Sequence, residues 1–207
     1  MYDIKLNFIN KSEVLNNKSV VIFQKNAAEN FEENTVAWKV IKNLARFESH
    51  PFVLPLNFEV AGQDSYGNYS TRLTTRIGEA YEIVPDYSLS LHTRYSGLSV
   101  NNTQVEISNK LPHGVLNVYC YKGGKIVATK NNLASGQKAA FKFHPRIYIG
   151  VVSQVMEGGI MNSAILSQVN TEINLLGISE ADIIMTGGGL GEDAEPFNFT
   201  LENVVKI

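Results

Sequence analysis

Residues 118–130 read Val118-Tyr119-Cys120-Tyr121-Lys122-Gly123-Gly124-Lys125-Ile126-Val127-Ala128-Thr129-Lys130. Two runs rich in β-branched and aromatic residues flank a Gly-Gly pair, and such runs favour strands. A two-residue connection with a positive φ at both positions is a type I′ turn, which joins two antiparallel strands with the correct twist. The stretch therefore predicts a β-hairpin that turns at Gly123 and Gly124.

Similar short β-prone runs, separated by turn residues, occur along the whole chain. Apolar and polar residues alternate with a period of two in short runs, and Asn, Gly and Pro separate these runs. Residues 146–152 are apolar on both faces, which predicts a central strand, whereas Pro51 and Pro55 place the alternating run 52–60 at a sheet edge or a bulge. Further strands are expected at 4–8, 19–25, 36–41, 69–76, 80–84, 88–94, 103–108, 138–143, 181–185 and 197–207. The predicted fold is all-β, an antiparallel β-sandwich of jelly-roll or immunoglobulin-like type with little helix.

Residues 165–176 fit two patterns. Leu166, Val169, Ile173 and Leu176 follow a helical period, while Thr171, Ile173 and Leu175 alternate as in a strand. Without an acidic first turn, the strand is the preferred interpretation. A short helix is expected at 27–33. With 207 residues, the chain is predicted to form a single β-sandwich domain, and two β subdomains divided near residues 97–103 are the alternative.

Composition excludes several classes of partner. Only 18% of the residues are charged, the formal net charge is −2, and no basic run exceeds two residues, so nucleic acid has no electrostatic binding surface. No apolar run approaches the ~20 residues of a membrane-spanning helix, and the N-terminus lacks the apolar core of a signal peptide. The single Cys120 excludes an intramolecular disulfide. The expected location is cytoplasmic, or exported without a classical signal peptide.

One segment resembles a known family. Residues 20–25 read Val-Val-Ile-Phe-Gln-Lys, and residues 36–39 read Val-Ala-Trp-Lys. A strand that ends in aromatic-Gln, followed by a strand that carries Ala-Trp, is similar to the pattern of the rhizosphere-induced protein family of small bacterial β-sandwich proteins. The resemblance spans residues 20–39. It implies a bacterial β-sandwich and supplies no catalytic residues.

Catalytic and metal-binding patterns are sparse. The four histidines, His50, His92, His113 and His144, lie far apart in the sequence and match no ligand spacing, and no pair of cysteines is available for zinc. A metal-dependent β-barrel enzyme would require His92, His113 and His144 to converge in space. Cys120 is expected to be an inert core thiol, and the glycines at 187–191 are followed by acidic residues that would repel phosphate. No cofactor is expected.

Exposed tyrosines suggest a second kind of function. Tyr66, Tyr69, Tyr87 and Tyr95 lie in or near predicted turns, among Asn and Ser residues. Aromatic rings beside neutral amides are compatible with a lectin-like surface, so a glycan is one expected partner.

The two ends of the chain suggest the preferred function. Both read as strands, with Ile4, Leu6 and Phe8 alternating at the start; the end of the chain has the apolar residues Phe197, Phe199, Leu201 and Val205. Terminal strands often pair with another chain, and a surface of low charge resists such association only weakly. The sequence therefore favours a non-enzymatic bacterial protein that forms a homo-oligomer or filament by pairing of its terminal strands. The alternatives are a lectin-like module and a histidine-metal enzyme.

Overall fold

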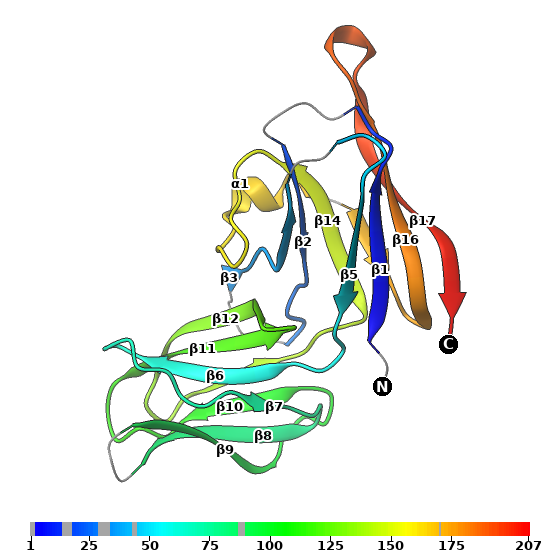
Figure 1. The fold of residues 1–207 in the computed structure, drawn as a ribbon. Helices are drawn as coiled ribbons and strands as arrows, with labels where there is room; N and C mark the ends of the chain where they lie inside the picture. The colour runs from blue at the N-terminus through cyan, green and yellow to red at the C-terminus, as the bar shows by residue number, and fades with distance from the viewer. Residues whose placement is uncertain (1–2, 14–17, 29–33, 43–44, 87–89, 170) are drawn as a thin grey trace. The chain divides into compact units, whose positions relative to one another are not determined.

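The described part of the computed structural model comprises residues 3–13, 18–28, 34–42, 45–86, 90–169 and 171–207 (Figure 1). Within it, seventeen strands, one four-residue α-helix and one short 3-10 helix follow one another along the chain. The strands form four sheets in which antiparallel pairs predominate. The prediction of an all-β sandwich with little helix is confirmed. No helix in these residues is long and apolar enough to cross a membrane.

The described residues divide into two compact units, each built from two of the four sheets. Unit 1 comprises residues 1–24, 36–56 and 145–207, and unit 2 comprises residues 25–35 and 57–144. The chain therefore passes between the units four times. The segment 97–103, where the sequence allowed a boundary, lies inside unit 2, at the end of one strand and before the next.

Unit 1 contains the first and last strands of the chain. Its first sheet has the order β17-β16-β1-β5, and its second has the order β15-β14-β2-β4. Strand β1 runs parallel to β16 and antiparallel to β5. The bounds are β1 Ile4–Asn10, β2 Ser19–Phe23, β4 Lys39–Ile41, β5 Ser49–Leu54, β14 Arg146–Val152, β15 Thr171–Asn174, β16 Ile178–Gly188 and β17 Glu195–Lys206.

The strand predicted to be central, β14, lies between β15 and β2, as expected. One face of this sheet is covered by a cluster in which Val21, Phe23 and Val152 pack with Met161 and Val169. Ile165 and Leu166 of helix α1, Ser163–Leu166, pack against that cluster. Because Ile147 and Ile149 are fully buried as well, β14 is apolar on both faces.

Unit 2 contains the hairpin predicted for residues 118–130. Strands β11 and β12 are antiparallel, and Gly123 and Gly124 connect them with φ values of 57° and 76°. Both values are positive, as a type I′ turn requires, and the hairpin prediction is confirmed. The sheets have the orders β3-β12-β11-β6-β7 and β13-β10-β8-β9. The bounds are β3 Asn34–Thr35, β6 Glu59–Asp64, β7 Leu73–Thr74, β8 Glu79–Pro85, β9 Leu91–Leu98, β10 Val105–Asn109, β11 Val115–Lys122, β12 Lys125–Ala134 and β13 Lys138–Phe141.

The two sheets of unit 2 touch closely through their buried faces. A Cβ atom added to Gly62 on β6 would lie 2.4 Å from Cδ1 of Ile83 on β8, so a side chain at position 62 would force Ile83 to move. The hydroxyls of Ser70 and Thr93 are 2.6 Å apart in the same interior. Cys120 is buried on β11, as predicted for a core thiol.

Two segments of the chain form different elements from those that the sequence predicts. The alternating run 52–60 was expected to be one strand, but β5 ends at Leu54 and β6 begins at Glu59, because the chain leaves unit 1 for unit 2 between them. The ambiguous segment 165–176 contains both elements, with the end of α1 followed by β15. Most of the helix expected at 27–33 lies outside the described residues.

Candidate functional site

The two terminal strands occupy different positions in one sheet. Strand β1 is paired with β16 on one side and with β5 on the other, so its backbone hydrogen-bonding groups are used on both sides. Ile4, Leu6 and Phe8 are at most 2% exposed and belong to the core of unit 1. Strand β17 is paired with β16 alone. Of the two predicted arms, β17 is the one with an open edge.

Strand β17 is the longest edge strand in the described part of the chain. It has 12 residues, and Figure 1 shows it in red as the outermost strand of its sheet. The opposite edge, β5, has 6 residues with Pro51 among them. The next longest, β9, has 8, and the remaining edge strands have 4 or fewer: β15, β4, β13, β3 and β7. Short edges and edge prolines are common protection against unwanted strand pairing, and β17 has the least of this protection.

The two faces of β17 differ in character. Phe199 is buried, and Phe197 and Leu201 beside it are half-buried on the face that carries the core residues Ile183 and Met185. Asn198 and Thr200 are exposed on the other face. Beyond them, Val205 is 51% exposed. The five residues 197–201 carry no charge, while Glu195 and Glu202 lie on either side of them in β17.

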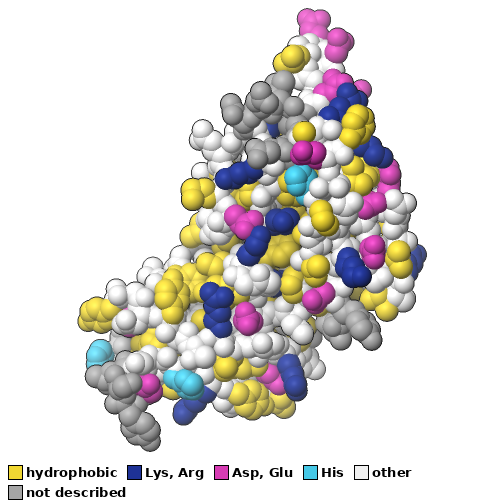
Figure 2. Space-filling model, viewed as in Figure 1, with side chains coloured by type: hydrophobic (Ala, Val, Ile, Leu, Met, Phe, Trp, Pro, Cys, Tyr) yellow, Lys and Arg dark blue, Asp and Glu magenta, His cyan; other side chains and the backbone are white. Residues whose placement is uncertain are grey.

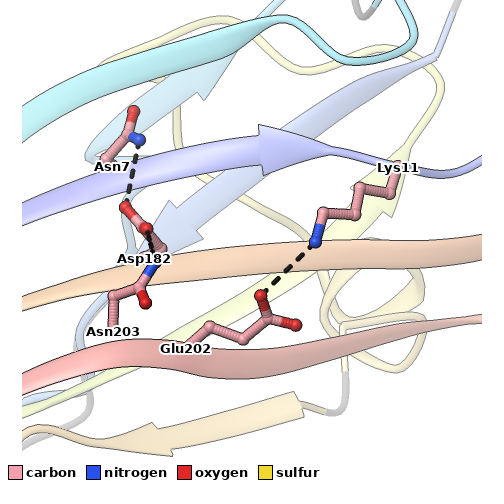
Figure 3. A network of polar contacts seen from close by, with 5 residues as sticks. All are labelled: Asn7, Lys11, Asp182, Glu202 and Asn203. Carbon is pink, nitrogen blue, oxygen red and sulfur yellow. Dashed lines mark hydrogen bonds and ion pairs between the residues drawn. The ribbon is translucent and has the colours of Figure 1, made fainter.

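A polar network holds the end of this segment in place (Figure 3). Asn203 has a φ of 50° and marks the bulge where the register of β16 and β17 shifts. Its side-chain amide donates to Asp182 Oδ2 at 2.6 Å, and Asn7 donates to Asp182 Oδ1 at 3.1 Å. Nearby, Lys11 Nζ lies 3.3 Å from Glu202 Oε2. The network ties the bulge to β16 and β1.

A cavity of about 330 Å³ lies on the same outer face of the sheet. Strands β1, β5 and β16 line it, with the charged side chains Lys5, Glu180 and Asp182 among the lining residues. Asn7 Oδ1 is buried there without a hydrogen-bond partner. The lining residues include no His, Cys or Ser.

The turn between β16 and β17 is glycine-rich and acidic. Residues 187–191 lead into the 3-10 helix Gly191–Asp193, whose first turn carries Glu192 and Asp193. Figure 2 shows these acidic side chains gathered at the tip of the hairpin. Negative charge at this position is unsuited to phosphate, in agreement with the interpretation of the sequence.

The candidate histidine ligands all lie in unit 2 but do not form a group. His92 is on β9, His113 is in the connection from β10 to β11, and His144 follows β13. Among the described residues, no group of three His, Cys, Asp or Glu side chains is close enough to hold a metal ion.

The candidate tyrosines are separated as well. Tyr66 is at the tip of the β6–β7 turn and is 89% exposed, Tyr95 is on β9 beside Tyr81, and Tyr87 lies outside the described residues. Tyr69 lies 6.0 Å from Tyr119, measured between ring centroids. Tyr119 was not among the candidate tyrosines, although it alternates with Tyr121 on one strand, which places both rings on one face of the sheet.

The resemblance of residues 20–39 to the rhizosphere-induced proteins, the bacterial origin and the location stay predictions. Comparison with family models, with curated proteins and with solved structures gave no match.

Proposed function

We propose that this protein is non-enzymatic and self-associates, with two copies joined along strand β17. The observation that carries the proposal is a 12-residue edge strand with one unpaired side, at the end of an otherwise well-paired sheet. In an antiparallel strand, alternate residues direct their N–H and C=O groups away from the existing partner. A second strand supplies the groups that satisfy them.

The pairing we propose is antiparallel, about a twofold axis. Two β17 strands then meet as identical surfaces, and two four-stranded sheets become one sheet of eight. A filament would require β17 of one copy to pair with β5 of the next. Pro51 on β5 cannot donate a hydrogen bond, and prolines in sheets stand where their nitrogen faces solvent. The closed dimer is therefore favoured over the filament that the sequence left open.

The expected affinity is modest. A six-residue antiparallel pairing forms about six hydrogen bonds, which at ~1 kcal/mol each contribute roughly 6 kcal/mol. Bringing two proteins together costs about 4–15 kcal/mol. The second copy would also cover part of the half-buried side chains Phe197 and Leu201, and this apolar burial favours association. The balance is small, so we expect a reversible dimer with a dissociation constant of roughly 0.1 to 1 mM.

Analytical ultracentrifugation of the whole chain tests this proposal, over roughly 1 µM to 1 mM protein. The double variant Asn198→Lys/Thr200→Lys places two ammonium groups on each open edge, outside the core. The matched control is Ser49→Lys/Val53→Lys, which adds the same charge on the same face of the sheet at β5. Circular dichroism monitors the fold.

The wild type and the β5 control should dimerise as concentration rises, and the β17 variant should stay monomeric with an unchanged spectrum. A wild type that is monomeric throughout, or a β17 variant that dimerises as well as the wild type, would refute the proposal.

A further inference from the structure

Unit 2 carries a row of tyrosines on the face of its five-stranded sheet that points away from the core. The ring centroids of Tyr69 and Tyr119 are 6.0 Å apart, and those of Tyr119 and Tyr121 are 6.3 Å apart. Tyr69 is 58% exposed, Tyr119 is half-buried and Tyr121 is buried. The exposed end of the row therefore offers aromatic surface to a ligand, while the buried end anchors it.

An arginine completes the row. The guanidinium carbon of Arg72 lies 3.9 Å from the ring centroid of Tyr121, within cation–π distance. Burial raises the pKa of Tyr121, and the positive charge of Arg72 opposes that rise. Within the described part of the chain, Arg72 forms no ion pair with a carboxylate. Glu59 is the register partner of Tyr121 on β6, and it too forms no ion pair with Arg72.

The Arg72 guanidinium lies against Tyr121, and its N–H groups that do not face that side chain remain for a planar acceptor. Two parallel N–H groups of a guanidinium fit the two oxygens of a carboxylate. Arg72 is exposed, so the edge is open to solvent.

The loop that carries these groups is held before any ligand arrives. The Asp64 carboxylate accepts hydrogen bonds from the backbone N–H groups of Tyr66 and Asn68, both at 2.9 Å, and from the Asn68 amide at 3.0 Å. Burial alone would raise the pKa of Asp64, but these hydrogen bonds lower it. A preorganised loop spares a ligand the entropy cost of ordering it.

An amide lies beside the exposed rings. The Tyr119 hydroxyl donates to Gln63 Oε1 at 2.8 Å, which fixes the orientation of that side chain. Gln63 Nε2 has only a long contact, 3.5 Å, to the Gly67 carbonyl. The amide N–H groups of Gln63 can therefore donate a hydrogen bond to a ligand hydroxyl placed over Tyr69 and Tyr119.

We propose that Tyr69, Tyr119, Gln63 and Arg72 bind a sugar that carries a carboxylate, such as a uronic or sialic acid residue of a glycan. The apolar face of the sugar ring packs on the tyrosines, which are rigid and amphipathic. The carboxylate pairs with Arg72 in the two-pronged geometry of arginine. Gln63 binds a ring hydroxyl. The proposal is independent of self-association, because none of these residues lies on β17.

A matched pair of small probes tests it on the whole chain. Methyl β-glucuronide and methyl β-glucoside share the same ring and differ only in carboxylate against hydroxymethyl. Titration of each into the isotopically labelled protein, followed by backbone amide chemical shifts, gives both the affinity and the location. Single sugars bind weakly, so titration extends to about 20 mM.

The glucuronide should shift amides of the 63–72 loop and bind about tenfold more tightly than the glucoside. Arg72→Gln should abolish that preference, and Tyr69→Ala should weaken both probes. The controls Arg76→Gln and Tyr95→Ala remove the same residue types elsewhere on unit 2 and should bind as the wild type does. Equal affinity for the two probes, no shift with either, or an unchanged preference in Arg72→Gln would overturn the proposal.

Discussion

Strands β1 and β17 have the same kind of sequence and different positions in one sheet. In β1, Ile4, Leu6 and Phe8 alternate with polar residues, and in the first half of β17, Phe197 and Phe199 do the same. The structure pairs β1 on both sides and β17 on one. Side chains project above and below a sheet, whereas hydrogen bonds lie within its plane. Alternation therefore tells which face of a strand is buried, but it does not tell whether both of its edges are paired.

The largest expected effect is on the free energy of unfolding, which should depend more on a core residue of β1 than on an edge residue of β17. Phe8→Ala should lower the free energy of unfolding by about 3–5 kcal/mol, because Phe8 is fully buried and leaves a cavity. Phe197→Ala should cost about 1 kcal/mol, since its ring is only half-buried. Urea denaturation of both variants at a concentration where the protein is monomeric measures the difference. Equal losses would mean that β17 is as deeply integrated as β1.

The second prediction opens the other edge of the same sheet. Pro51→Thr restores a backbone N–H on β5, the edge of the sheet that a β17–β17 dimer leaves free, so dimers can join through β5 into longer assemblies. Light scattering should then report particles larger than a dimer as concentration rises. Pro55→Thr, just beyond the end of β5, is the control and should behave as the wild type does. If Pro51→Thr keeps the size of the wild type, proline is not what blocks this edge.

The smallest expected effect concerns the bulge that ends the regular part of β17. Asn203→Gly keeps the positive φ without strain and loses the hydrogen bond to Asp182, so it should cost about 1 kcal/mol. Asn203→Val loses the same bond and adds the strain of a β-branched residue at φ 50°. Thermal unfolding should rank the wild type above Asn203→Gly, and Asn203→Gly above Asn203→Val. Identical losses in both variants would show that the backbone relaxes freely at this position.

Local chemistry made several features predictable. Two adjacent glycines gave the β11–β12 turn, because few other residues adopt a positive φ at both positions. Residues 146–152 are apolar at both odd and even positions, so both faces of the strand were expected to be covered. This pattern predicted the central strand β14. Pro51 gave the edge position of β5, because a proline cannot donate to a neighbouring strand.

Contacts between distant residues were not predictable in this way. The division of 52–60 into β5 and β6 depends on the passage of the chain from one unit to the other, which leaves the alternation of side chains unchanged. The bulge at Asn203 depends on Asp182, which is 21 residues away. The placement of Arg72 over Tyr121 depends on how the β6–β7 loop folds back on the sheet, and no spacing encodes it.

The sequence by itself determined that this chain is a β-sandwich protein, where several of its turns and strands lie, and which faces of those strands are apolar. These properties follow from φ preferences and from side-chain alternation, both of which are local. Only the tertiary structure decided that β1 is central and β17 an edge, that the three candidate histidines stay apart, and that Arg72 stacks on a tyrosine. The order of strands in a sheet and the convergence of side chains depend on contacts between residues far apart in the chain. Local sequence patterns do not specify which distant segment a strand pairs with.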